Sequence, residues 1–426
     1  MTIAIFLGAL LGAMAIGVPI AYSLLLCGVA LMWHLDLFDA QILAQNVIGG
    51  ADSFPLLAVP FFMLAGEIMN VGGLSKRIVD FALAVVGHVK GGLGYVTIMA
   101  GCLLSALSGS AVADAAALTA LLLPMMVKAG HDKPRAAGLI AATGVIGPVI
   151  PPSIGLVIFG VAANVSISKL FLAAIVPGLM IGAALWLTWA WLVRREKIVP
   201  PPLKSSAEIF ATFRKAIWAL MLPIIILEGL RMGVFTPTEA AVVAAVYALF
   251  VSTVIYREIT WRDLHAIFVS AAKTSAIVMF LIAAAMVSAW LITVADLPSK
   301  IVGLLEPFMG NQILLMIAIM VIVMIVGTAM DMTPTILILT PVLMPVVKAA
   351  GIDPVYFGVL FIINNSIGLV TPPVGTVLNV VAGVGKISMD DVTRGVVPFM
   401  IAEFAILFVM VAFPQLVIAP ARWFGG

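Results

Sequence analysis

The chain has 426 residues, of which 63% are hydrophobic and only 10% are charged. Soluble domains carry about 25% charged residues, so this composition excludes an ordinary soluble protein and predicts an all-α polytopic membrane protein. The net charge of +2 provides no basic field for nucleic acid, and the two cysteines, Cys27 and Cys102, lack the spacing of a metal site.

Two segments near the start of the chain predict helices of different kinds. The apolar run 2–35 has no basic start and is longer than the core of a signal peptide. We therefore expect a retained transmembrane helix that bends near Gly17 and Pro19. Residues 40–53 mix amide and acidic side chains with apolar ones, which predicts an amphipathic helix lying at the membrane interface.

Two glutamates have different expected roles. Glu67 interrupts an apolar helix, where an acidic side chain commonly has a function inside the protein or faces water. A structural role, near a membrane interface or in an ion pair with Lys76 or Arg77, is the favoured alternative. Glu239 follows Thr236 by three residues, which is the pattern of a capping box. Glu239 is therefore expected to cap a helix rather than to take part in transport.

A hairpin is expected at about 93–127, which is apolar except for Asp114 and residues near its centre. The centre contains Ser108, Gly109 and Ser110. Small hydroxyl residues beside a glycine favour the tip of a re-entrant hairpin, where carbonyls and hydroxyls are free to bind a cation. Small residues also serve ordinary helix packing, so the pattern gains weight only if it recurs later in the chain.

The next segment, about 136–165, predicts a broken membrane helix. Its centre reads TGVIGPVIPPSIG, with Pro148, Pro151 and Pro152 in an uncharged run. Proline removes a backbone donor and clashes with the preceding turn, so a helix that enters this stretch must break there. Broken spans of this kind are the best sequence pointer to a transport site.

The second half of the chain repeats this arrangement. A hairpin is expected at about 311–347 and a broken helix at about 355–385, where Pro372 and Pro373 take the places of the earlier proline pair. Proline and glycine landmarks recur with one constant offset, so the sequence contains a duplication. Whether the two copies are inverted depends on an odd number of membrane crossings between them, which hydropathy alone does not fix.

A hydrophilic linker at 194–214 divides the chain into a first half, 1–193, and a second half, 215–426. The linker contains basic residues and three consecutive prolines. Its basic excess predicts a cytoplasmic location. Residues 297–308, with two prolines, are expected to lie at the membrane interface.

The interruptions suggest a mechanism. A helix broken in hydrocarbon leaves amides and carbonyls without intrahelical partners, which is costly unless bound ions or substrate satisfy them. Free amides at the start of a half-helix favour an anion such as a carboxylate, whereas carbonyls and hydroxyls suit a hard cation such as sodium. Sodium bound there would neutralise and order the site for an anionic solute, and this would couple uptake to the ion gradient.

Four motifs now point to a known family. PFFMLAGEIMNVGG, IGPVIPPSIG, FTPTEAA and GLVTPPVGT together resemble the large membrane subunit of tripartite ATP-independent periplasmic (TRAP) transporters, along essentially the whole chain. The resemblance implies an elevator-type, sodium-coupled transporter with its hairpins and broken helices in inverted repeats. It would lie in the bacterial inner membrane and take up a dicarboxylate, sialic acid or sugar acid. It also implies two partners, a small four-helix membrane subunit and a periplasmic solute-binding protein. Sodium is the coupling ion, and no other cofactor is expected.

Carried over by motif, the resemblance places each sodium site between a hairpin tip and a broken helix, with the substrate between the two pairs. The implied tips are 108–110 in the first hairpin and 327–329 in the second. For Asp114 and Asp331, which follow the two tips, capping of the second hairpin arm is favoured over sodium ligation. The residues implied are Ser108, Gly109, Ser110, Gly144, Pro148 and Pro151 for the first sodium site; Gly327, Thr328, Asn364, Gly368, Thr371 and Pro372 for the second; and Pro152, Ser153, Pro373 and Thr376 for the substrate.

Other classes of function fit less well. The four histidines are scattered without a catalytic spacing, which argues against an enzyme. Gly385 and Lys386 lack the rest of a phosphate-binding loop, which argues against an ATP-driven pump. A channel stays open as an alternative because re-entrant hairpins also build pores. The closest alternative is a stand-alone sodium- or proton-coupled carboxylate carrier that needs no binding protein.

Overall fold

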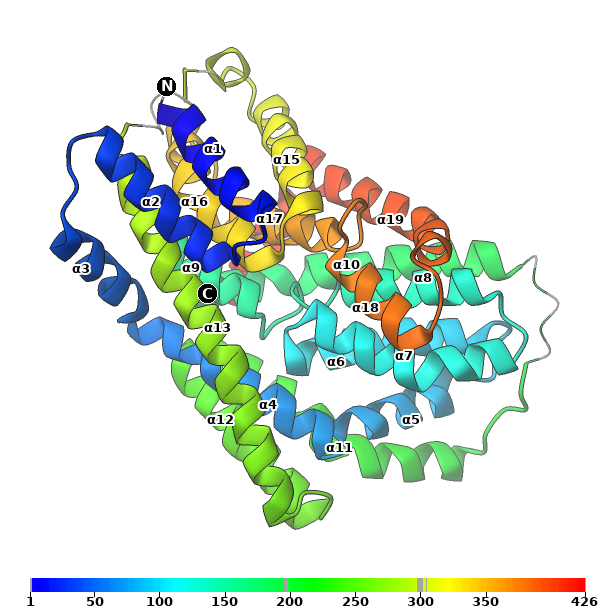
Figure 1. Cartoon of the computed structure of the whole chain (residues 1–426). Helices are drawn as coiled ribbons and strands as arrows, with labels where there is room; N and C mark the ends of the chain where they lie inside the picture. The colour runs from blue at the N-terminus through cyan, green and yellow to red at the C-terminus, as the bar shows by residue number, and fades with distance from the viewer. Residues whose placement is uncertain are drawn as a thin grey trace.

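The computed structural model describes residues 2–194, 196, 198, 200–296, 302–303 and 305–425. In these residues every regular element is a helix, which confirms the all-α prediction (Figure 1). Within the same residues, nine helices are long and apolar enough to cross a membrane. The chain is therefore a multi-pass membrane protein, as its apolar composition predicts.

The first apolar run forms two helices, so the prediction of one bent helix over 2–35 is wrong. Helix α1 (Thr2–Ala15) is followed by α2 (Ile20–His34), and the two lie side by side (Figure 1). Gly17 has a left-handed φ of 86°, and Pro19 has no amide hydrogen to continue the helix. The chain therefore reverses direction at this point.

A group of helices that we call the outer layer lies along one side of the molecule (Figure 1). In it, α13 packs against α2, α3 and α4, α4 packs against α12, and α11 packs against α5. Helices α11 and α12 both begin with a capping box. The capping box of α12 pairs Thr236 with Glu239, which confirms the capping role predicted for Glu239. The bounds are α3 (Ala40–Ala51), η1 (Phe54–Leu57), α4 (Ala58–Val71), α5 (Leu74–Val86), α11 (Ser206–Arg231), α12 (Pro237–Phe250), η2 (Val251–Ile255) and α13 (Trp261–Val294).

The remaining helices form two series with the same order. Each series has a helical hairpin, two short helices separated by an irregular break, and a long helix. The first series is α6 (Gly92–Ser108), α7 (Ala111–Lys128), α8 (Lys133–Gly144), α9 (Ile154–Ala163) and α10 (Ile167–Val193). The second is α15 (Gln312–Ala329), α16 (Met332–Ala349), α17 (Pro354–Gly368), α18 (Thr376–Gly385) and α19 (Met389–Ala412), preceded by η3 (Glu306–Phe308) and followed by α20 (Gln415–Gly425).

Helices α8 and α17 lie at the centre of the core. All residues of α8 from Ala136 to Gly144, and all residues of α17 from Tyr356 to Gly368, are buried. A helix that is apolar on every side must be surrounded by other elements. The two helices that break are therefore the two that the rest of the chain surrounds.

Some predicted connectors are shorter than expected. Helix α11 begins at Ser206, inside the linker predicted at 194–214, because Ser205 and Glu208 form a capping box there. Arg195, Lys197 and Val199 of this linker lie outside the described residues. Much of the predicted interfacial segment 297–308 also lies outside them, namely residues 297–301 and 304.

Candidate functional site

The tip of the first hairpin lies between Ser108, which ends α6, and Ala111, which begins α7. Gly109 has a left-handed φ of 60°, and the hydroxyl of Ser110 caps α7 by accepting from the amide of Ala113. Because Ser110 supplies the cap, the prediction that Asp114 caps this arm is wrong.

Asp114 has a different environment. Its Oδ1 accepts a hydrogen bond of 2.6 Å from the hydroxyl of Ser108, whose oxygen in turn accepts from the amide of Ser110 at 3.2 Å. The second carboxyl oxygen, Oδ2, is buried and has no hydrogen-bond partner among the described residues. A buried carboxylate oxygen without a partner is costly, so this atom is a ready ligand for a cation.

The first break, residues 145–153, is fully buried. The hydroxyl of Ser153 donates to the carbonyl of Pro148 and accepts from the amide of Leu156 at 3.2 Å, so Ser153 caps α9. Pro151 lies in the break, and its peptide bond to Pro152 is cis. The bonds of Ser153 fix the start of α9, whose free amides point back toward the break.

The first hairpin tip and the first break are in direct contact. A Cβ atom built on Gly109 would lie 2.6 Å from the carbonyl oxygen of Pro152. One built on Gly147 would lie 2.9 Å from Asp114 Oδ2, and one built on Gly144 would lie 3.1 Å from the carbonyl oxygen of Ala111. Backbone carbonyls and the free Asp114 oxygen therefore meet where the first sodium site was expected.

The second hairpin turns later than the sequence predicts. Gly327, Thr328 and Ala329 were expected at the tip but lie in the last turn of α15, and Met330 and Asp331 make the turn instead. Helix α15 continues through Gly327 because a glycine permits a turn without requiring one. Asp331 occupies the cap position of α16, but its side chain makes no capping hydrogen bond.

Two adjacent asparagines hold the second hairpin against α17. The amide of Asn364 donates to the carbonyl of Met320 at 2.6 Å, and the amide of Asn365 donates to the carbonyl of Met332 at 3.0 Å. Each bond reaches a different arm of the hairpin, α15 or α16. The side-chain oxygens of both asparagines are buried without a partner in the described part of the chain.

The second break, residues 369–375, also contacts its hairpin. A Cβ atom on Gly368 would lie 2.8 Å from the carbonyl carbon of Gly327, and the amide of Val374 donates to the carbonyl of Thr328 at 3.3 Å. The hydroxyl of Thr371 donates to the carbonyl of Ile367 at 2.8 Å. The buried Thr376 hydroxyl has no partner among the described residues. Unlike Pro151 and Pro152, Pro372 and Pro373 are exposed.

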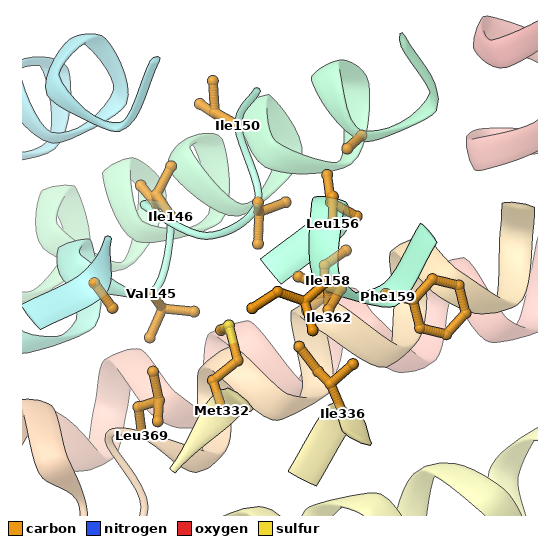
Figure 2. Packing of buried hydrophobic residues seen from close by; sticks show 14 of the residues in the cluster. Val145, Ile146, Ile150, Leu156, Ile158, Phe159, Met332, Ile336, Ile362 and Leu369 are labelled. Carbon is orange, nitrogen blue, oxygen red and sulfur yellow. The ribbon is translucent and has the colours of Figure 1, made fainter. Parts of the chain in front are cut away.

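An apolar core joins the two hairpin and break pairs. A Cβ atom on Gly144 would lie 3.4 Å from Val377 of α18, and one on Gly155 would lie 2.8 Å from the sulfur of Met332. Figure 2 shows this packing, with Leu156 of α9, Met332 of α16 and Ile362 of α17 directed toward one another. The two expected sodium sites and the substrate residues between them thus belong to one packed unit.

A cavity of about 140 Å³ lies between the first hairpin and helices α4 and α13 of the outer layer. Ser108, Ser110 and Asp114 line one side of it, and Glu67 lies on the other side. The ion pair expected for Glu67 is wrong, because Arg77 pairs with Glu258 at 2.6 Å and Glu67 Oε1 accepts from the hydroxyl of Ser270 at 3.0 Å. Sequence reasoning missed the place of Glu67 in this cavity, and it also missed Asn365 beside Gly327.

Comparisons with known proteins agree with this architecture. The family model for the tripartite ATP-independent periplasmic transporter, DctM component, matches residues 7–416. The chain is 59% identical to the 2,3-diketo-L-gulonate TRAP transporter large permease protein YiaN of Escherichia coli K12, over 99% of this chain and 100% of that protein. It is 39% identical to the sialic acid TRAP transporter large permease protein SiaM of Vibrio cholerae, over 98% and 97% of the two chains.

Similarities extend to a more distant relative and to a solved fold. The C4-dicarboxylate TRAP transporter large permease protein DctM of Pseudomonas aeruginosa is 36% identical over 91% of each chain. The crystal structure of the Alcanivorax borkumensis YdaH transporter superposes with a TM-score of 0.65 at 16% identity, over 89% of this chain and 91% of that one, and so shares the fold. The chain therefore belongs to the DctM family of TRAP transporter large permeases, which are transport proteins and not enzymes.

Proposed function

We propose that this protein is the large permease of a sodium-coupled system that takes up an organic acid across the bacterial inner membrane. In this proposal a small four-helix membrane subunit completes the permease, and a periplasmic solute-binding protein delivers the substrate. The family supports the class of transport, and the names of the relatives specify 2,3-diketo-L-gulonate, sialic acid and C4-dicarboxylates. All of these are organic acids.

The observation that carries sodium coupling is the presence of buried oxygen atoms without partners where hairpins meet breaks. Within the described residues, Asp114 Oδ2 lies in the first contact, and Asn365 Oδ1 lies in the second, beside Gly327 and Gly368. Hard cations prefer oxygen ligands, and carbonyls freed by the breaks supply more of them. A sodium ion in each contact would satisfy atoms that the protein itself leaves unsatisfied.

The amides freed by the same breaks suit the substrate. Helices α7 and α9 start beside each other, at Ser110 and Ser153, and their first amides lack intrahelical partners. A substrate carboxylate would be stabilised there by these amides and by the neighbouring sodium ion. This arrangement makes the binding of sodium and of the organic acid mutually favourable.

Contacts at the two ends of α10 support an inverted repeat. His131 and Arg135, at the start of α8, both contact Glu196, just beyond the end of α10. Lys169, at the start of α10, lines a pocket together with Asp353, which caps α17. Since the 27 residues of α10 span about 40 Å, the two broken helices begin on opposite sides of the membrane. Such a pair suits alternating access, in which the packed unit moves against the outer layer.

Uptake by the purified proteins in proteoliposomes tests this function. We expect saturable uptake of the organic acid that requires an inward sodium gradient, the small membrane subunit and the binding protein. Uptake that persists without the binding protein would favour the stand-alone carrier. Flux that does not saturate would favour a channel. Uptake that does not depend on the sodium gradient would overturn the proposed sodium coupling.

A further inference from the structure

The cavity between the hairpin and the outer layer has two sides with different chemistry. The hairpin side carries Ser108, Ser110 and Asp114, next to the starts of α7 and α9. The outer-layer side carries Glu67 and Asn70 of α4 and Thr274 of α13. The first side suits a carboxylate with its sodium ion, whereas the second side offers groups that hydrogen-bond to hydroxyls.

The charges around the cavity are unusual for a site that takes an anion. Its described lining includes two acidic residues, Glu67 and Asp114, and no lysine, arginine or histidine. Asp114 is only 4% exposed, and its Oδ2 atom has no partner in the described structure. A bound cation would offset the cost of burying this oxygen. On the other side, no cationic residue of the described lining adjoins Glu67, whose Oε1 atom accepts from the Ser270 hydroxyl.

We propose that this cavity binds a polyhydroxylated monocarboxylate and rejects a dicarboxylate, and that Glu67 is the residue that makes the distinction. The inference rests on the proposed function, because it places the substrate carboxylate and sodium at the hairpin side. Glu67 then receives the hydroxyl groups at the far end of the molecule. A sugar acid has this pattern of one carboxylate and several hydroxyls.

Two physical effects favour the hydroxylated acid. The Glu67 carboxylate would accept hydrogen bonds from the substrate hydroxyls. Hydrogen bonds to a charged acceptor are stronger than those between neutral groups. Asn70 and Thr274 supply further donors and acceptors on the same side. A second carboxylate at this end would instead face the Glu67 carboxylate without a neutralising lysine or arginine in the described lining.

Glu67 lies across the cavity from the residues of the proposed sodium site, on a helix outside the packed unit. Glu67 belongs to α4, and Ser270 of α13 fixes its carboxylate from a position 203 residues later. Neither residue belongs to the packed unit that contains the hairpin tips and breaks. A change at Glu67 therefore alters the selection among acids while the cation ligands stay in place.

Binding measurements on the full chain together with its small membrane subunit in lipid nanodiscs test the proposal. The probes are gluconate, adipate and hexanoate, which have equal carbon numbers and differ in hydroxyls and in the second carboxylate. In sodium buffer we expect wild-type protein to bind gluconate at least about tenfold more tightly than either of the others. Glu67→Gln should weaken gluconate binding by about tenfold and strengthen adipate binding.

Glu239→Gln is the matched control, since Glu239 caps α12 at the surface and does not line the cavity. It should leave the affinities for all three probes unchanged. Adipate binding as tight as gluconate binding, or equal affinity shifts for all three in Glu67→Gln, would overturn the inference. If all three bind equally and only in sodium, the inference fails and the proposed function stands. If none shows sodium-dependent binding, both fail.

Discussion

At the residue scale, the first proposed sodium site depends on the carboxylate of Asp114. One of its oxygens is held by Ser108, and the other is buried beside Gly147 without a partner among the described residues. An amide in this place would still accept from Ser108 but would carry no charge. Under the proposed function, the charge of Asp114 rather than its size is therefore the property that sodium binding requires.

Replacing Asp114 by Asn tests this requirement. Asn has nearly the same shape and keeps an oxygen for the Ser108 hydroxyl. We expect the sodium concentration for half-maximal uptake to rise by about tenfold or more, because the loss of a charged ligand costs more than about 1.4 kcal/mol. The measurement is uptake as a function of sodium at fixed substrate. Unchanged sodium dependence would remove Asp114 from the site.

Thr371 provides a milder test at the second break. Its hydroxyl donates to the carbonyl of Ile367, which leaves the oxygen lone pairs available to a cation. Thr371→Val should raise the sodium concentration for half-maximal uptake, and Ser110→Val should do the same at the first site. Thr188→Val is the control, since Thr188 makes the same bond, to Ala184, within the continuous helix α10. Equal effects of the Thr371 and Thr188 changes would contradict a ligand role.

At the element scale, close backbone contact holds each break against its hairpin. Gly368→Ala would place a Cβ atom 2.8 Å from the backbone of Gly327, which has no flexible side chain to move away. We expect Gly368→Ala to lower the thermal stability of the protein and to abolish the stabilisation that sodium provides. The measurement is a thermal unfolding curve with and without sodium.

Gly383→Ala supplies the contrast within α18. A Cβ atom on Gly383 would meet nothing within 4 Å. Alanine is favoured over glycine in a helix by about 0.5–1 kcal/mol, so this change should be neutral or stabilising. If Gly383→Ala also abolishes the stabilisation by sodium, the loss of this stabilisation in Gly368→Ala is not caused by the close contact at Gly368.

Local signals in the sequence located much of this architecture, and long-range contacts account for the parts that were missed. Proline at 151 and 152 interrupts a helix by its own covalent structure, so the first break was predictable. The partner of Glu67 was not, because Ser270 lies in another helix and only packing brings it near. The second hairpin tip was predicted too early, at Gly327. A glycine favours a turn locally, but this preference does not show whether the helix before it ends there or continues.

At the scale of the whole molecule, the two repeats interlock. Helix α18 of the second series packs against α7 and α8 of the first, and α16 packs against α9. The side chain of Lys133, at the start of α8, donates to the carbonyl of Lys386, just after α18, at 2.9 Å. A movement of one hairpin relative to the other would disrupt these contacts. The two series therefore form one packed body, as the movement proposed above requires.

Inversion of the repeats predicts where two loops lie. Ala129 lies just after α7 and Ala349 ends α16; both are exposed, and they lie at corresponding ends of the second hairpin arms. In protein that lacks Cys27 and Cys102, we expect Ala129→Cys to react with an impermeant maleimide only from the cytoplasmic side, where basic residues gather. Ala349→Cys should react only from the periplasmic side. Labelling of both from the same side would contradict the inversion, because parallel repeats would place the two loops together.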